Sequence, residues 1–366
     1  MSETLRGLLA RHVAAGTMPG AVGVWGDGEP FAVGRAGPDG AEMRADAVFR
    51  IQSMTKVITA TATLRLVQDG IIALDDPVAR WLPELSAPRV LPHPDAPLGE
   101  ARPARRPITV RHLLTNTSGY GMMTSDSPLR AAMATAGVEA GAEPVPLGAQ
   151  DWLDALAALP LAFEPGEGWR YHHSFGLLGI LLGRVGARPT EEVLRATVFD
   201  PAGMTDTGFR VRPGEEHRLV AAYRRGPEGF VETEPAEAGF FVAPPYDVSH
   251  SELVSTAVDF RAFLRALWDG RLIDRELVDE LQRDQVPASA KTADSFFPGF
   301  WEGTGWGYGV SVVTDGQHQG RVGWSGGLGT DFFVDADGTS CVVLTQVELD
   351  DSVFGMIGEL QGVTSA

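Results

Sequence analysis

The sequence predicts an α/β protein of the α+β type, with an antiparallel sheet built from N- and C-terminal segments and flanked by helices. Strand-like runs with turn residues between them occur before residue 35 and after residue 305. The long middle of the chain instead carries helical patterns separated by Pro and Gly. Strands at both ends and helices between them favour one sheet shared by the two ends, with a mostly helical subdomain inserted.

The N-terminal part predicts a helix, two strands and a second helix, in that order. Residues 1–12 have an amphipathic pattern, and residues 21–25 and 31–34 are short strand-like runs on either side of a Gly-Asp-Gly turn. Residues 53–70 are almost entirely apolar or small and end at a glycine. A helix without a clear polar face is a buried one, so we expect this helix to lie in the core.

The rest of the chain predicts further helices and four more strands. We expect helices at residues 108–115, 152–159, 175–185, 255–268, 275–282 and 352–360. We expect strands at residues 306–313, 319–324, 331–334 and 340–347. The predicted domains are a sheet domain of residues 1–73 and 253–366 and a mostly helical inserted subdomain of residues 74–252.

Three stretches of the middle are expected to be irregular. Residues 92–107 are rich in Pro and Arg without an apolar period, which indicates a surface excursion. Residues 121–150 and 226–250 lack strong periodicity and predict two long loops. Loops of that length in a compact protein are often lids or binding loops.

The composition narrows the classes of partner. With 44% hydrophobic and 21% charged residues, the 366-residue chain resembles an ordinary soluble globular protein. The formal net charge of −18 argues against nucleic acid or an anionic membrane as a partner. The single cysteine, Cys341, excludes an intramolecular disulfide and fits a reducing compartment. The N-terminal segment lacks a secretory signal pattern and no stretch could span a bilayer, so we expect a cytoplasmic protein.

Lys56 is the most informative residue of the chain. Only two of the 30 basic residues are lysines, Lys56 and Lys291. A lysine kept in so arginine-rich a chain is a candidate for giving up its proton near neutral pH, which arginine cannot do. Ser53 precedes it in the S-x-x-K sequence Ser53-Met54-Thr55-Lys56, and residues i and i+3 of a helix lie on one face. A neutral amine beside a hydroxyl can make it a nucleophile, and burial of the helix would lower the pKa of the lysine.

Two further segments carry candidate chemistry. Tyr171 stands at a loop-to-helix junction in Trp169-Arg170-Tyr171-His172-His173, where it could serve catalysis or simply pack its ring. The adjacent histidines cannot face the same way on a helix, and they lack the i, i+4 spacing of a metal pair. The glycine-rich run 323–331 lies between two strands, where it could donate N–H groups to an oxyanion or form a plain hairpin turn.

Taken together, these segments resemble the serine β-lactamase and penicillin-binding-protein superfamily. More narrowly, the chain is similar to the class C β-lactamase-related esterases, the family VIII carboxylesterases. The resemblance runs over nearly the whole chain and keeps the order and spacing of several segments. These are residues 49–56, 74–78, 108–119, 163–166, 199–209 and 253–257.

The resemblance implies roles for particular residues. Ser53 would be the acylated nucleophile, and Lys56 and Tyr171 would share the general-base work. The backbone N–H groups of Ser53 and Gly327 would form the oxyanion hole. The remaining substrate-binding candidates are Trp324, Ser325 and Gly326 in the place of a K-T-G triad, together with His173 and Gln52. No metal or organic cofactor is expected.

Departures from the pattern surround the substrate and leave Ser53, Lys56 and Tyr171 intact. His173 replaces the asparagine of a Y-x-N motif, Trp324 replaces the triad lysine, and residues 249–252 replace a glycine-rich run. The sequence therefore predicts a serine hydrolase, a carboxylesterase acting on a small-molecule ester or amide. An acyltransferase with the same intermediate remains open, as do a β-lactamase or D-amino-acid peptidase and an inactive binding protein. We expect one of His172 and His173 to face the cleft, and the pattern favours His173.

Overall fold

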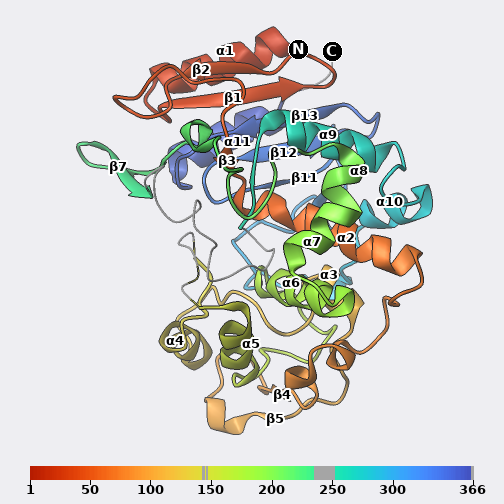
Figure 1. Ribbon diagram of the computed structural model, residues 1–366. Helices are drawn as coiled ribbons and strands as arrows, with labels where there is room; N and C mark the ends of the chain where they lie inside the picture. The colour runs from red at the N-terminus through yellow and green to blue at the C-terminus, as the bar shows by residue number, and fades with distance from the viewer. Residues whose placement is uncertain (142–144, 146, 235–251, 364–366) are drawn as a thin grey trace.

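The computed structural model describes residues 1–141, 145, 147–234 and 252–363. Its main feature is a seven-stranded sheet whose neighbouring strands are all antiparallel (Figure 1). In order across the sheet, the strands are β2 (Phe31–Gly34), β1 (Gly20–Trp25), β13 (Ser340–Leu344), β12 (Asp331–Val334), β11 (Val322–Ser325), β10 (Ser311–Val313) and β9 (Thr304–Trp306). Every strand comes from one of the two ends of the chain, so the predicted fold class is confirmed.

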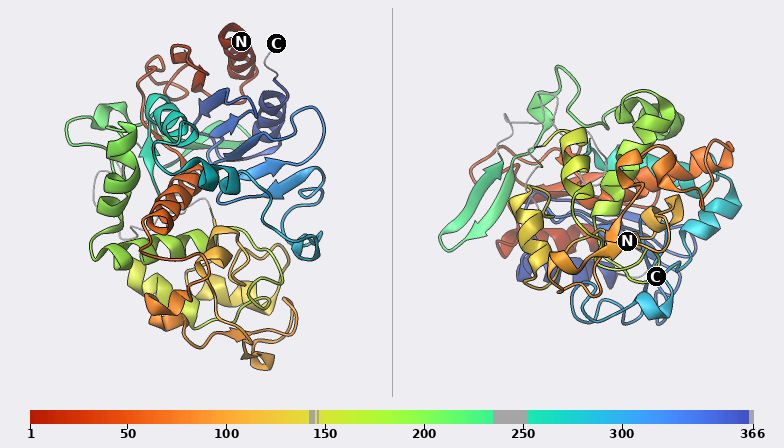
Figure 2. Two further views of the ribbon diagram at one scale, coloured as in Figure 1. Left: turned by 90° about the vertical axis from the view of Figure 1, so that its right-hand side faces the viewer. Right: turned by 90° about the horizontal axis from the view of Figure 1, so that it is seen from below.

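The sheet buries both faces, and alternate residues of its strands enter two different cores. On one face, Cys341 and Val343 pack with α1 (Ser2–Ala14) and α11 (Asp351–Gln361). On the other face, Val342 and Leu344 join the larger core, which contains α9 (Ala257–Trp268) and α2 (Thr55–Gln68). The period of two in a strand produces this division, and it explains why the strands are apolar throughout instead of alternating. Figure 2 shows the layers from two further sides.

Helix α2 is buried around almost its whole circumference, as its sequence predicts. Residues 55–64 are all buried, although four of them are threonines. Three of the hydroxyl groups donate to backbone carbonyls one turn earlier in the helix: Thr59 to Thr55 at 3.2 Å, Thr61 to Val57 at 2.8 Å and Thr63 to Thr59 at 2.8 Å. The Thr55 hydroxyl instead accepts from Leu253 N at 3.4 Å. Such bonds to the preceding turn let a polar side chain enter a core without an unpaired group.

The middle of the chain supplies most of the remaining elements, and α4 and α5 lie at the end of the molecule opposite α1, with α3 and α6 between them and the sheet (Figure 1). The helices are α3 (Val110–Leu114), α4 (Pro128–Thr135), α5 (Ala149–Ala157), α6 (His173–Gly186), α7 (Thr190–Leu194), α8 (Asp200–Ala202) and, later in the chain, α10 (Arg275–Leu281). The short strand pairs are β3 (Phe49–Arg50) with β8 (Val254–Ser255), β4 (Arg89–Val90) with β5 (Arg102–Pro103), and β6 (Ala222–Gly226) with β7 (Gly229–Glu234).

Three local predictions were wrong. The expected loop 121–150 contains α4 and the start of α5, because Ser127 caps a helix through the Arg130 N–H at 3.2 Å. The expected loop 226–250 begins inside the β6–β7 hairpin, and its residues after 234 lie outside the described part of the chain. The expected strand 306–313 is two strands, since Gly309 turns the chain with a φ of +80° where a Cβ would lie 2.9 Å from the Lys56 carbonyl oxygen.

The division into two domains remains a proposal. No residue from 74 to 234 that the structure describes contributes to the seven-stranded sheet, which favours the predicted boundaries. The β6–β7 hairpin lies within that range but attaches to the sheet part, because Tyr223 N donates to the Gln346 carbonyl at 2.8 Å. Among the described residues, no helix is both long enough and apolar enough to cross a bilayer.

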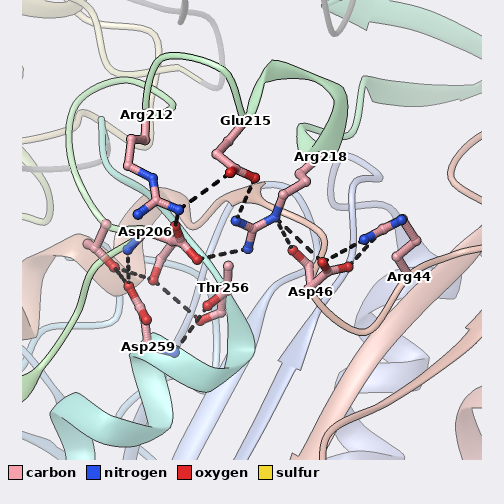
Figure 3. Close-up of polar contacts among 10 residues, drawn as sticks. Arg44, Asp46, Asp206, Arg212, Glu215, Arg218, Thr256 and Asp259 are labelled. Atoms are coloured by element: carbon pink, nitrogen blue, oxygen red, sulfur yellow. Dashed lines mark hydrogen bonds and ion pairs between the residues drawn. The ribbon is translucent and has the colours of Figure 1, made fainter.

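A network of partly and fully buried charges fixes the start of α9 (Figure 3). Asp259 Oδ2 accepts hydrogen bonds from Asp206 N at 2.7 Å and from Thr207 Oγ1 at 2.9 Å. Thr207 Oγ1 also lies 2.8 Å from Ser255 Oγ in β8. Since β8 pairs with β3, this network holds the strand that leads into α2.

Arg218 closes the network from the opposite side. Its guanidinium donates to Asp206 Oδ2 at 2.8 Å, to the Asp46 carbonyl at 2.8 Å and to Glu215 Oε2 at 3.2 Å. Its side chain is only 8% exposed, whereas that of Arg212, which pairs with the same Asp206, is 51% exposed. The two arginines therefore offer a matched comparison of a buried and an exposed ion pair.

We expect Arg218→Ala to lower the free energy of unfolding by about 3 kcal/mol, because it removes a largely buried guanidinium and leaves the partly buried Asp206 paired only with the exposed Arg212. Arg212→Ala should lower it by less than about 1 kcal/mol, because water screens the exposed pair. Urea unfolding followed by circular dichroism measures both. Equal losses in the two variants would contradict the greater contribution expected of the buried ion pair.

Candidate active site

Ser53 and Lys56 meet at the start of α2, as their spacing predicts. A 3₁₀ turn of Gln52–Met54 runs directly into α2 and presents Ser53 half-buried. Lys56 Nζ lies 3.0 Å from Ser53 Oγ as a hydrogen-bond donor, and the lysine side chain is fully buried. Burial lowers the pKa of Lys56 to about 7, and the negative charge of Glu252 opposes this shift. Near neutral pH the amine can therefore lose its proton and accept that of the serine hydroxyl.

Tyr171 completes a three-residue constellation from the loop before α6. Lys56 Nζ lies 4.6 Å from the centre of the Tyr171 ring, and Trp324 Nε1 donates to Tyr171 Oη at 2.6 Å. Burial raises the pKa of Tyr171 well above its ordinary value, although hydrogen bonds to Ser53 and Trp324 partly offset the rise. The phenol is therefore neutral at physiological pH and suited to donating a proton, while Lys56 is the better base.

The glycine-rich turn after β11 packs against the residues just before Ser53. A Cβ at Gly326 would overlap Thr330 Oγ1 and lie 2.6 Å from the Ile51 carbonyl oxygen, so only glycine fits there. Thr330 Oγ1 donates to that same carbonyl at 3.1 Å. A Cβ at Gly327 would lie 3.4 Å from Gln52 Oε1. The turn is thus fixed beside the 3₁₀ turn of Ser53, as a shared oxyanion hole requires.

Gln52 is a strained residue immediately before the proposed nucleophile. Its φ of +50° lies in the left-handed region, which a side chain other than glycine adopts at a cost. Such conformations persist where the surrounding contacts hold them, and they gather at functional sites. Here the hydrogen bond from Ile51 N to the Leu253 carbonyl, at 3.0 Å, holds the chain just before the strained residue.

Trp324 and Ser325 are consecutive in β11 and point to opposite faces of the sheet. The Trp324 indole faces Tyr171, whereas Ser325 Oγ donates to Asp331 Oδ1 at 2.6 Å. Gln361 of α11 donates to the second oxygen of Asp331 at 2.7 Å. Burial raises the pKa of Asp331 to about 7. The proton of the Ser325 hydroxyl is thus used by Asp331, on the side of the sheet where α11 packs.

His173 does not lie at the rim of the site, and this corrects our expectation. Its side chain is buried, Nε2 lies 2.7 Å from the Val138 carbonyl oxygen, and its ring stacks on Trp152 at 6.0 Å between centroids. Burial lowers the pKa of His173 to about 4, so its imidazole stays neutral. The physical reason lies in two other segments, because Trp152 of α5 and the carbonyl of Val138 contact the His173 ring. His172 instead lies against Tyr171, with ring centroids 5.9 Å apart, and has a φ of +95°.

Sequence reasoning missed three features beside the site. Glu252, which acts on the pKa of Lys56, directly precedes the matched segment 253–257. Asp331 gave no signal, because its importance depends on Gln361, which is distant in sequence. Residues 295–301, Ser-Phe-Phe-Pro-Gly-Phe-Trp, hold four aromatic residues in seven positions, which was a visible signal of an aromatic surface.

Known proteins resemble this chain over most of its length. The family described as Beta-lactamase matches residues 5–351. Esterase EstB of Burkholderia gladioli is 33% identical over 347 residues, which cover 88% of this chain and 82% of EstB. Protein Rv1367c of Mycobacterium tuberculosis is 36% identical over 308 residues, which cover 82% of this chain and 75% of that protein.

A comparison of structures agrees with the comparison of sequences. The structure of EstCE1, described as a hydrolase with promiscuous acyltransferase activity, superposes with a TM-score of 0.81. The superposition covers 97% of this chain and 98% of EstCE1 at 24% identity, which shows a shared fold. The chain therefore belongs to the Beta-lactamase family, and its resemblance to the family VIII carboxylesterases is confirmed.

Proposed function

We propose that the protein is a carboxylesterase that works through a covalent acyl-Ser53 intermediate. One observation carries the proposal: a fully buried lysine amine with a pKa of about 7 lies 3.0 Å from the hydroxyl of a half-buried serine. That pair supplies an activated nucleophile at neutral pH without a metal. The name of EstB, an esterase, supports an ester as the substrate.

The geometry supports a division of labour among the three side chains. Neutral Lys56 takes the proton of Ser53, and Ser53 Oγ attacks the ester carbonyl carbon. The N–H groups of Ser53 and Gly327 hold the resulting oxyanion. Tyr171 gives its proton to the leaving alcohol as the C–O bond breaks, and the proton held by Lys56 restores the tyrosine. Water then attacks the acyl-serine ester, and the same groups return the free acid and Ser53.

Acyl transfer is the second candidate function, because the same intermediate can react with an alcohol instead of water. The description of EstCE1, a hydrolase with promiscuous acyltransferase activity, favours keeping it. The structure offers less support for a β-lactam or D-amino-acid substrate. Trp324 stands where the family pattern has a lysine, and its indole N–H is used by Tyr171. The cytoplasmic location expected from the sequence stays a prediction.

Ser53→Ala should abolish hydrolysis of p-nitrophenyl acetate, because no other group in the proposed cycle can carry the acyl chain. Intact-mass and peptide mass spectrometry of the wild type with a slowly deacylated ester should show one acyl group, on the peptide that contains Ser53. Unchanged circular dichroism of the variant excludes a folding defect. An acyl group on another residue, or activity in the variant, would contradict the proposed acyl-Ser53 intermediate.

The pH dependence of kcat/KM should report the protonation of Lys56. The rate should rise with pH around a midpoint near 7, since only the neutral amine is a base and burial lowers the pKa of Lys56 to about 7. Removing the negative charge with Glu252→Gln should move that midpoint to lower pH, because this charge favours the protonated amine. Glu359→Gln, on the distant surface of α11, is the control and should leave the midpoint in place. A shift to higher pH would refute the assignment.

Product analysis separates hydrolysis from transfer. In buffer with an activated acetate ester and millimolar benzyl alcohol, we expect acetic acid as the main product and benzyl acetate as a minor one. The reason is that water at about 55 M competes for an intermediate on a half-buried serine. Gas chromatography measures both products. Benzyl acetate in excess over acetic acid would identify the protein as an acyltransferase.

A further inference from the structure

An aromatic surface leads from Tyr171 toward the outside of the molecule. The ring centroid of Phe296 lies 5.2 Å from that of Tyr171 and 6.2 Å from that of Trp324. Phe297 follows, with its centroid 4.8 Å from that of Phe296 and half of its side chain exposed. We call Trp324, Phe296 and Phe297 the aromatic wall. It gives a continuous apolar path from solvent to the proposed proton donor.

Buried rings form the base of the aromatic wall. The Trp169 ring centroid lies 5.7 Å from that of Phe296, 5.5 Å from that of Phe300 and 5.4 Å from that of Trp306. Trp169 and Trp306 are fully buried and Phe300 is nearly so. These contacts make edge-to-face and tilted pairs of the kind that aromatic side chains prefer. The wall is therefore a rigid surface instead of a set of loosely placed rings.

Polar anchors hold the loop that carries Phe296 and Phe297. Arg170, next to Tyr171, donates to Asp294 Oδ2 at 2.9 Å, and Thr124 Oγ1 donates to the Asp294 carbonyl at 2.8 Å. Lys291 pairs with Asp284, and its amine lies 5.3 Å from the Trp301 ring centre. The second lysine of the chain thus has a structural place in the same loop. A surface anchored in this way needs no ordering when a ligand binds.

The rings of the aromatic wall contact solvent, unlike the rings of a protein core. Phe296 and Trp324 are both partly exposed, and Phe297 is 51% exposed. Apolar rings kept in contact with water beside a reactive group indicate a binding surface. Flat rings offer a ligand stacking and edge-to-face contacts that an aliphatic surface cannot.

The contact between Trp324 and Tyr171 decides which part of an ester meets the wall. Trp324 Nε1 donates to the same phenol oxygen that, in the proposed cycle, protonates the leaving alcohol. That alcohol must therefore leave beside Trp324 and Phe296. We propose that the aromatic wall binds the alcohol part of the substrate and that esters of flat, aromatic alcohols are the preferred class. This inference rests on the proposed function and adds the side of the ester on which selection occurs.

The test compares esters that differ in one half only. The first ratio divides kcat/KM for 2-naphthylmethyl acetate by kcat/KM for ethyl acetate, two esters of primary alcohols with the same acyl group. The second ratio divides kcat/KM for ethyl 2-naphthylacetate by kcat/KM for ethyl acetate, which varies the acyl part alone. Phe296→Ala should lower the first ratio about tenfold and Phe297→Ala about threefold, from the lost ring contacts and apolar burial. The second ratio should stay within about twofold of the wild type, since lost ring contacts act only on the group they touch.

Phe354→Ala is the matched control, because Phe354 is 53% exposed but lies on α11. It should change neither ratio. If the Phe296 and Phe297 variants lower the second ratio and not the first, the wall binds the acyl part and the proposal is wrong. The proposal is also wrong if neither ratio changes. If the wild type hydrolyses none of these esters, the proposed function has failed. Calorimetric binding of 2-naphthylmethanol to wild type and Phe296→Ala then still decides whether the wall binds such an alcohol, and equal affinities would reject it.

Discussion

The proposed chemistry of this protein depends on the burial of one amine, that of Lys56, away from water. The Lys56 ammonium loses its hydration when α2 is enclosed on all sides, and this lost hydration, more than any single neighbour, brings its pKa to about 7. A helix can be enclosed in this way only if packed elements surround it. Helices α6 and α7 pack against α2, and residues of α9 and of the sheet belong to the same core. Elements from both ends and from the middle of the chain thus combine to bury this one side chain.

The residues around this amine show how closely the chain must approach it. Gly309 turns next to the backbone of Lys56, Gly326 turns against Ile51, and neither position has room for a side chain. Gln52 and His172, one before Ser53 and one after Tyr171, both adopt positive φ. Ser53 and Tyr171 are therefore each adjacent to a residue with a strained backbone. Such strain is tolerated because the burial of the surrounding core is large compared with its cost of about 1–3 kcal/mol for each residue.

The sequence was informative wherever a property is local. The scarcity of lysine, the i, i+3 spacing and the apolar run of α2 predicted that Ser53 and Lys56 would touch, and the terminal strand patterns predicted the sheet. It was uninformative wherever a partner comes from elsewhere. The direction of His173 depends on Val138 and Trp152, and that of Ser325 depends on Asp331. The β9–β10 turn resembled strand because its residues are apolar, and only the approach to Lys56 shows why a glycine stands there.

The sheet shared by the two ends of the chain has a consequence for folding during synthesis on the ribosome. Strand β1 pairs with β13, with Val22 opposite Leu344, so one edge of β1 stays unpaired until the C-terminal strands are made. Contacts between such distant residues make folding slow and expose apolar strands to aggregation while synthesis continues. Over that time Lys56 remains hydrated and keeps the proton of an ordinary lysine. The nascent chain therefore has no neutral lysine to activate Ser53, and the nucleophile becomes reactive only when the fold is complete.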